Sequence, residues 1–323
     1  MGMLAALTLC AAGLAVLILG AELLVSGGVR IAARMGISPM LIGMTVVAIG
    51  TSAPELAVGI DAAIKGSGDL AVGNIAGTNV VNILLILGLS AFMLPLALRP
   101  DTLRLDLPMI VAASLLLWAL CADASLSRVD GLVLMAGALV YTALILNLAR
   151  RDNRAARAAV PPAEAAPADS RRAVLDLMAL AGGIVIAVVG ADLLVDGAVA
   201  LARLWQVSDA FIGLTVVAIG TSAPELVTTL VSTLKRQRDI AIGNLLGSST
   251  YNILFILGVT CVISPDAVAV NPVLLGTDIP VMVAVSLLCV PVFFSGRQVS
   301  RLEGGAFVAA YLGYLAYTIV TRT

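Results

Sequence analysis

The sequence contains no histidine, and only 12% of its 323 residues are charged and 4% aromatic. The absence of histidine removes the side chain most often used to bind zinc or copper and to shuttle protons near neutral pH. The four cysteines share no short metal-binding spacing and lie in or beside apolar runs, which is typical of residues that face lipid or a core. The net charge of -1 gives no indication of a nucleic-acid partner.

The sequence is rich in apolar residues, because 60% of its residues are hydrophobic. A soluble domain is about half apolar and about a quarter charged, so a chain of this composition is expected to use a lipid bilayer as its solvent. The apolar N-terminus lacks a basic segment in front of it and is predicted to be a first membrane span rather than a cleaved signal.

Apolar runs separated by charges predict an all-α polytopic membrane protein with ten transmembrane helices. One hydrophilic segment, 150–172, is rich in alanine, proline and charge and is predicted to be a flexible linker between the halves 1–149 and 173–323. The predicted helices cover 3–30, 37–64, 70–97, 105–122, 129–149, 173–202, 207–234, 239–263, 274–295 and 302–321.

The distribution of positive charge predicts the orientation. With ten helices, both termini lie on one side and the linker on the other. All of the 19 Lys and Arg residues except Lys65, Arg128, Arg203 and Arg322 fall on the linker side. The positive-inside rule therefore predicts a cytoplasmic linker and external termini, in a bacterial inner membrane.

The strongest pattern is an internal repeat at an offset of 170 residues. Residues 41–56 (LIGMTVVAIGTSAPEL) and 211–226 (FIGLTVVAIGTSAPEL) differ at two positions, and 13–28 and 71–88 align without gaps with 183–198 and 241–258. An odd number of helices in each repeat makes the two repeats antiparallel. Inverted repeats are typical of secondary transporters, which bind substrate near the midplane where interrupted helices meet.

The repeated GTSAPE segment predicts a kinked helix that carries oxygen ligands. Pro54 has no amide hydrogen, so we expect the helix to bend there and to leave the carbonyls near Ala48 and Gly50 without intrahelical partners. Carboxylate, hydroxyl and carbonyl oxygens are hard donors that suit Na⁺ and Ca²⁺. The two copies supply Ala48, Thr51, Ser52, Glu55, Ala218, Thr221, Ser222 and Glu225.

The next helix of each repeat adds a hydroxyl and an amide four residues apart, which places them on one helix face. These pairs are Thr78 with Asn82 and Ser248 with Asn252. Proline kinks, helical hydroxyls and amides also occur for packing alone. Two acidic residues in mid-membrane are costly, however, and these helices contain no nearby Lys or Arg partner, so a cation site is the favoured interpretation.

Other acidic residues leave alternatives open. Glu22 and Asp192 are matched across the repeats and either guard an ion pathway or fix contacts between helices. Asp61 has no acidic equivalent in the second repeat and is predicted to lie in a vestibule or at a rim rather than in the site.

Paired GTSAPE and GN-containing blocks in two inverted halves resemble the α-repeats of the cation/calcium exchanger superfamily, and in particular the prokaryotic sodium/calcium exchangers. The resemblance covers essentially the whole chain. It implies ten helices around a central site, with Glu55 and Glu225 as Ca²⁺ ligands. It also implies Na⁺ ligation by the hydroxyls of both motifs and by the carbonyls of Ala48 and Ala218.

Two positions depart from the family pattern. Asn252 stands where some members carry Asp, which leaves two acidic groups in the site and disfavours K⁺ co-transport. Thr78 stands where Ser is frequent, and its additional methyl group is expected to alter the affinity for Na⁺.

We therefore expect an antiporter that exchanges Na⁺ for Ca²⁺ by alternating access, without a cofactor or an obligate protein partner. The alternatives are a Ca²⁺/H⁺ exchanger, because a buried glutamate can be protonated, and a transporter of Mg²⁺ or another divalent cation. A membrane scaffold would not need paired glutamates at the midplane, and a channel would lack the two-sided closure that inverted repeats provide. The sequence shows no nucleophile with a base or phosphate-binding loop that would indicate an enzyme.

Overall fold

A computed structural model describes residues 2–100, 102–159, 170–206 and 218–322. Eight helices in this part of the chain are long and apolar enough to cross a membrane, and one bent helix pair makes a ninth. The predicted seventh helix, 207–234, lies partly outside the described residues. The all-α membrane fold is confirmed, whereas the count of ten stays a prediction.

The first half runs through nine helical segments, several of which form continuous spans. They are α1 (Met3–Met35), α2 (Pro39–Ile42), α3 (Ala48–Thr51), α4 (Ala53–Ile64), α5 (Gly68–Val80), α6 (Gly88–Met93), α7 (Leu107–Leu120), the 3₁₀ turn η4 (Cys121–Asp123) and α8 (Arg128–Ala159). Wider π-helical turns interrupt the spans at η1 (Gly43–Val47), η2 (Val81–Leu87) and η3 (Thr102–Asp106).

The second half repeats this order. It contains α9 (Ser170–Leu204), α11 (Ala218–Thr221), α12 (Ala223–Leu234), α13 (Arg238–Tyr251), α14 (Leu257–Ile263), α15 (Ile279–Phe294) and α16 (Arg301–Arg322), with π turns at η6 (Asn252–Ile256) and η7 (Leu274–Asp278). Helix α8 continues to Ala159 and α9 begins at Ser170, so the predicted linker 150–172 is partly helical. The linker prediction was wrong at both ends because alanine and arginine, which flank the proline-rich centre, favour helix.

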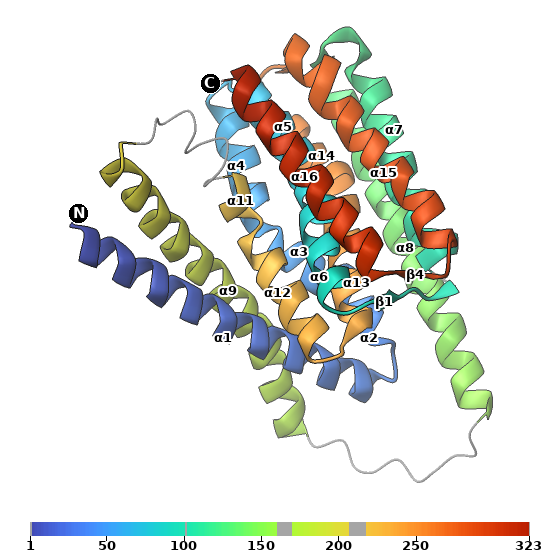
Figure 1. The fold of residues 1–323 in the computed structure, drawn as a ribbon. Helices are drawn as coiled ribbons and strands as arrows, with labels where there is room; N and C mark the ends of the chain where they lie inside the picture. Colours follow the sequence, from blue (N-terminus) through green and yellow to red (C-terminus); the bar gives the residue numbers. More distant parts are fainter. Residues whose placement is uncertain (1, 101, 160–169, 207–217, 323) are drawn as a thin grey trace.

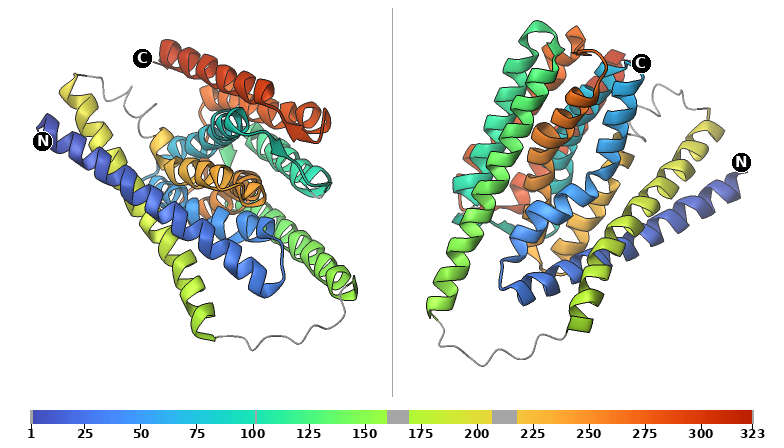
Figure 2. Two further views of the ribbon diagram at one scale, coloured as in Figure 1. Left: turned by 60° about the horizontal axis from the view of Figure 1, so that its bottom comes forward. Right: turned by 180° about the vertical axis from the view of Figure 1, so that it is seen from behind.

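Helices α1 and α9 lie side by side along one flank of the bundle, and the remaining helices pack beyond them (Figures 1 and 2). A Cβ atom on Gly13, Gly20 or Gly27 would overlap the α9 backbone near Leu194, Ala187 and Leu180, respectively. The contacted residue number falls as the glycine number rises, so the two helices run antiparallel. The first helices of the two repeats therefore point in opposite directions, as the inverted repeat predicts.

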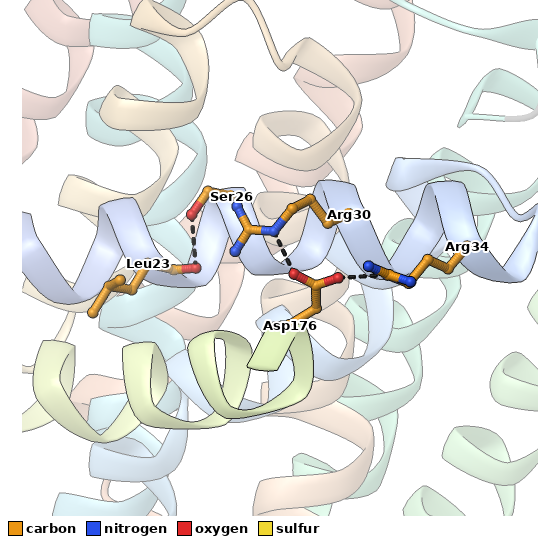
Figure 3. A network of polar contacts seen from close by, with 5 residues as sticks. All are labelled: Leu23, Ser26, Arg30, Arg34 and Asp176. Atoms are coloured by element: carbon orange, nitrogen blue, oxygen red, sulfur yellow. Dashed lines mark hydrogen bonds and ion pairs between the residues drawn. The ribbon is translucent and has the colours of Figure 1, made fainter. Parts of the chain in front are cut away.

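Ion pairs join α1 to α9 near the start of α9. Arg30 Nε and Arg34 Nε each lie 2.5 Å from one carboxylate oxygen of Asp176, whose side chain is only 7% exposed (Figure 3). The end of α8 and the start of α9 lie at the same end of the molecule (Figure 1). We call this end the linker face and the opposite end the terminal face.

Two short antiparallel strand pairs connect the halves, and the sequence analysis did not predict them. Strand β1 (Leu96–Ala97) pairs with β4 (Gln298–Val299), and β2 (Ser125–Leu126) pairs with β3 (Val268–Ala269). Each pair joins a loop of one repeat to a loop of the other. Strands of two residues carry too little sequence pattern to be detected, because alternation needs at least four residues.

Candidate ion-binding site

The GTSAPE segment forms a broken helix, as predicted. Helix α3 ends at Thr51, α4 begins at Ala53, and the two parts of the span are bent by 43°. Pro54 occupies the first turn of α4, where its missing N–H is tolerated. The second motif breaks in the same way at Ser222, between α11 and α12. Each break places a glutamate in the first turn of the helix that follows.

One part of the kink prediction was wrong. The Ala48 carbonyl is not left without an intrahelical partner, because it accepts the Ser52 amide at 3.2 Å. It also accepts the Ser248 hydroxyl of the other repeat at 3.2 Å. The helix bends just after this bond, since Ser52 adopts a conformation outside the helical region while its N–H still reaches back. Ala218 opens α11 at the equivalent position.

Glu55 and Glu225 are fully buried and close enough for their charges to interact. Ser52 Oγ donates to Glu225 Oε1 across the repeat boundary at 2.9 Å. The other three carboxylate oxygens, which are both oxygens of Glu55 and Oε2 of Glu225, have no hydrogen-bond partner among the described residues. Buried carboxylate oxygens without a donor are costly in a low-dielectric interior, so this position requires a cation or a proton.

The third helix of each repeat brings further oxygens to the same interior. Thr78, Asn82, Ser248 and Asn252 are all at most 2% exposed. Asn82 Nδ2 donates to Ser249 Oγ at 3.4 Å, and its carbonyl oxygen has no partner among the described residues. The same is true of the Thr78 hydroxyl and of both polar atoms of Asn252. Both asparagines lie in π-helical turns, a feature that is frequent at functional sites.

The hydroxyls of the two GTSAPE motifs differ in their surroundings. Thr51 is buried and donates to Asn244 Oδ1 at 3.2 Å, whereas Thr221 is half-buried. Ser222 is buried, and its hydroxyl has no partner in the described part of the chain. The repeats are therefore equivalent in sequence but not in hydrogen bonding.

Asn244 is a residue of the site that the sequence analysis did not single out. Its oxygen accepts from Thr51, and its Nδ2 donates to Thr229 Oγ1 at 3.1 Å, so it joins the broken helix of one repeat to that of the other. The signal was available, because Asn244 and Asn74 occupy the same position of the repeated Gly-Asn block.

A second pair of buried acids was also missed. Asp106 and Asp278 are 1% and 3% exposed and end the π turns η3 and η7. Tyr141 donates to Asp106 at 3.4 Å, and Tyr314 donates to Asp278 at 2.8 Å. These contacts attach the outer helices α8 and α16 to the bundle. Their repeat offset of 172, instead of 170, hid the match in an ungapped comparison.

The remaining acidic residues lie outside the central cluster. Glu22 pairs at 3.4 Å with Lys235, which directly follows α12, and is half-exposed, which supports the helix-contact alternative for this residue. Asp192 is exposed. Asp61 is exposed and pairs with Lys65 one turn away on its own helix, in agreement with a position at a rim.

The central cluster therefore combines two carboxylates with neutral hydroxyl, amide and carbonyl oxygens. The described residues contain no group of three or more His, Cys, Asp or Glu side chains placed to hold a metal ion. A site with only two acidic groups and many neutral oxygens fits a hard cation that exchanges, and not a tightly held transition metal.

Fold and site together define a helical membrane protein whose two inverted repeats meet at buried carboxylates, which is the architecture of secondary transporters. The sequence profile described as "Sodium/calcium exchanger protein" matches residues 5–147 and 175–320. The chain belongs to this family, which consists of transporters. The two matched segments fall within the two predicted halves.

Individual proteins agree with this assignment. The chain is 36% identical to Inner membrane protein YrbG of Escherichia coli (strain K12), over 95% of each chain. It is 29% identical to Sodium/calcium exchanger MaX1 of Methanosarcina acetivorans, over 94% of this chain and 95% of that protein. The structure of the sodium-calcium exchanger NCX_Mj superposes with a TM-score of 0.83 at 28% identity, covering 98% of this chain and 99% of that one.

Proposed function

We propose that this protein exchanges Na⁺ for Ca²⁺ across the membrane by alternating access to one central site. The observation that carries the proposal is the meeting of Glu55 and Glu225, one from each inverted repeat, with three of their four carboxylate oxygens free of hydrogen bonds within the described residues. Two negative charges match one Ca²⁺, and the surrounding neutral oxygens can complete its coordination.

We assign the ligands as follows. Glu55 and Glu225 bind Ca²⁺ directly, and Asn82 and Asn252 complete the shell or orient the carboxylates. The hydroxyls of Thr51, Ser52, Thr221, Ser222, Thr78 and Ser248, with the carbonyls of Ala48 and Ala218, bind Na⁺. The contact of Ser248 with the Ala48 carbonyl supports this assignment, because it brings two of these oxygens from different repeats to 3.2 Å.

The charge of the site makes the two ions competitors. One Ca²⁺ neutralises the two carboxylates, whereas about three Na⁺ leave one excess positive charge, so that simultaneous occupancy is strongly repulsive. Exchange with this stoichiometry moves net charge across the membrane and responds to the membrane potential.

We further propose an orientation with the linker face in the cytoplasm and both termini outside, in a bacterial inner membrane. The concentration of Lys and Arg at the linker face supports the orientation. The name of the Escherichia coli relative, an inner membrane protein, supports the location.

Flux of radiolabelled Ca²⁺ into proteoliposomes tests the proposal. Vesicles loaded with Na⁺ should take up Ca²⁺ when the external Na⁺ is removed, and a K⁺ gradient should not replace the Na⁺ gradient. Uptake should accelerate when the vesicle interior is made positive, because a cycle that carries one Ca²⁺ in and about three Na⁺ out moves one positive charge outward. Na⁺-driven uptake that ignores the membrane potential would contradict the electrogenic stoichiometry.

A Ca²⁺/H⁺ exchanger is the second candidate, because both oxygens of Glu55 lack a donor among the described residues and a proton could neutralise them. Ca²⁺ uptake driven by a pH gradient in vesicles free of Na⁺ would favour this alternative over Na⁺ coupling.

A further inference from the structure

Helix α12 carries a row of hydroxyls that starts at the site glutamate. Thr228, Thr229, Ser232 and Thr233 follow Glu225 by three, four, seven and eight residues, which places all of them on its face of the helix. All four are fully buried. We call these four residues the hydroxyl stripe.

The first repeat lacks this feature. After Glu55, the equivalent positions hold Val58, Gly59, Ala62 and Ala63. Since the motifs that precede them are identical, the difference is confined to the part of the helix that leads away from the site. One repeat continues with an apolar face and the other with hydroxyls.

Most hydroxyls of the stripe have no partner. The hydroxyls of Thr228, Ser232 and Thr233 make no hydrogen bond within the part of the chain that the structure describes. A helical threonine usually donates to the carbonyl four residues earlier, as Thr260 does to Ile256 at 2.8 Å and Thr142 to Ala138 at 2.8 Å. The hydroxyls of Thr228, Ser232 and Thr233 make no such bond to their own helix and are available to another group.

The stripe leads from the site to the linker face. A rise of about 1.5 Å per residue gives about 12 Å from Glu225 to Thr233. Helix α4, which carries Glu55 in its first turn, runs toward the opposite end of the molecule (Figure 1). The buried hydroxyl of Ser90, on the neighbouring helix α6, also lacks a partner among the described residues. The face of α12 that extends from Glu225 toward the linker face is therefore polar and buried.

We propose that the hydroxyl stripe binds Na⁺ transiently on its way between the two-carboxylate site and the linker face. This inference rests on the proposed Na⁺/Ca²⁺ exchange. Neutral hydroxyls can replace part of the hydration shell of a monovalent cation without a carboxylate that would hold it. The bond from Asn244 to Thr229 connects the stripe to Thr51, so the path begins within the site itself.

The test removes the three stripe hydroxyls that lack a partner and keeps the side-chain volumes nearly unchanged. The triple variant Thr228→Val, Ser232→Ala, Thr233→Val gives this helix face an apolar surface like that of the first repeat. A matched triple variant, Thr228→Ser, Ser232→Thr, Thr233→Ser, retains every hydroxyl. Thr318→Val, in the outer helix α16, removes a buried hydroxyl that donates to Tyr314 and controls for hydroxyl loss elsewhere.

The measurement is Na⁺-dependent flux of radiolabelled Ca²⁺ in inside-out and right-side-out membrane vesicles, which expose opposite faces of the protein to the added Na⁺. In the apolar triple variant, we expect the apparent KM for Na⁺ to rise at least about fivefold at the linker face, comparable to the loss of one hydrogen bond. The KM at the terminal face and the affinity for Ca²⁺ in detergent should not change. Both control variants should behave like the wild type.

An equal change at both faces, or no change at either, would overturn the inference while leaving the proposed exchange intact. A marked fall in the apparent Tm of the apolar variant would also overturn it, because it would assign the hydroxyls to packing. If the wild-type protein itself shows no Na⁺-dependent Ca²⁺ flux, the proposed function fails and the inference with it.

Discussion

Two adjacent glycines of α9 allow a sharp test of how the two repeats pack. A Cβ atom on Gly183 would overlap the backbone nitrogen of Leu24 in α1, whereas a Cβ atom on Gly182 would meet nothing within 4 Å among the described residues. Both residues lie in the same turn of the same helix. Substitution of each by alanine therefore introduces the same methyl group into opposite environments.

The expected effects have opposite signs. Alanine stabilises a helix by about 1 kcal/mol relative to glycine, and Gly182→Ala should gain up to this amount. Gly183→Ala gains the same helix-propensity stabilisation but forces α1 and α9 apart. Overpacking of this kind costs about 1–3 kcal/mol or more of stability. The contact is with rigid backbone, so the upper part of that range applies. We expect the two variants to differ by roughly 2–3 kcal/mol.

The assay is thermal unfolding of the purified proteins in the same detergent, followed by intrinsic fluorescence. A difference of this size corresponds to an apparent Tm that is lower in Gly183→Ala than in Gly182→Ala by on the order of 5 °C. Equal shifts of Tm in the two variants would refute the close antiparallel packing of α1 on α9, and so would a larger loss in Gly182→Ala.

Three further predictions concern single contacts. Ser52→Ala removes the donor to Glu225 and should weaken Ca²⁺ binding about tenfold in equilibrium titrations, because a hydrogen bond to a charged group contributes about 1.5 kcal/mol or more. Tyr314→Phe leaves the buried Asp278 with one donor fewer and should lower the stability by about 1–2 kcal/mol in thermal unfolding. Arg236→Gly should raise the stability by about 1 kcal/mol, since Arg236 has a φ of 58°, which a side chain disfavours.

Each of these has a matched control. Ser222→Ala removes a hydroxyl that has no partner among the described residues, and an equal loss of Ca²⁺ affinity would contradict the special role of Ser52. Tyr317→Phe changes a tyrosine that is 51% exposed and should be neutral. Gly66→Arg introduces a side chain where φ is 69° and should destabilise, which mirrors Arg236→Gly in the other repeat.

The sequence predicted the architecture because two copies of one pattern were compared with each other. Identity across GTSAPE predicted a helix break near Pro54, two residues from its observed place at Ser52, and the odd helix number in each repeat predicted the antiparallel arrangement that α1 and α9 display. The burial of Glu55 and Glu225 was also expected, since apolar runs surround both of them.

What the sequence did not predict depends on three-dimensional neighbours. The Ala48 carbonyl keeps its helical bond because the chain bends only after Ser52, and proline spacing alone cannot locate the bend to one residue. The role of Asn244 arises from its contact with Thr51, a residue of the other repeat that lies 193 positions away in the sequence. The ion pairs that Arg30 and Arg34 form with Asp176 likewise join residues from different halves.

The most direct test of the account is Ca²⁺ flux through Glu55→Gln and Glu225→Gln in proteoliposomes with an imposed Na⁺ gradient. Each variant removes one charge at about 4 Å from the bound ion, which at an effective dielectric constant near 20 costs about 4 kcal/mol per unit of ion charge, so the affinity for Ca²⁺ should fall by at least roughly a thousandfold. Asp61→Asn, which neutralises an exposed carboxylate on the same helix as Glu55, should transport normally. We predict that both glutamine variants lose Na⁺-driven Ca²⁺ uptake, and wild-type uptake by either one would contradict the assignment of the site.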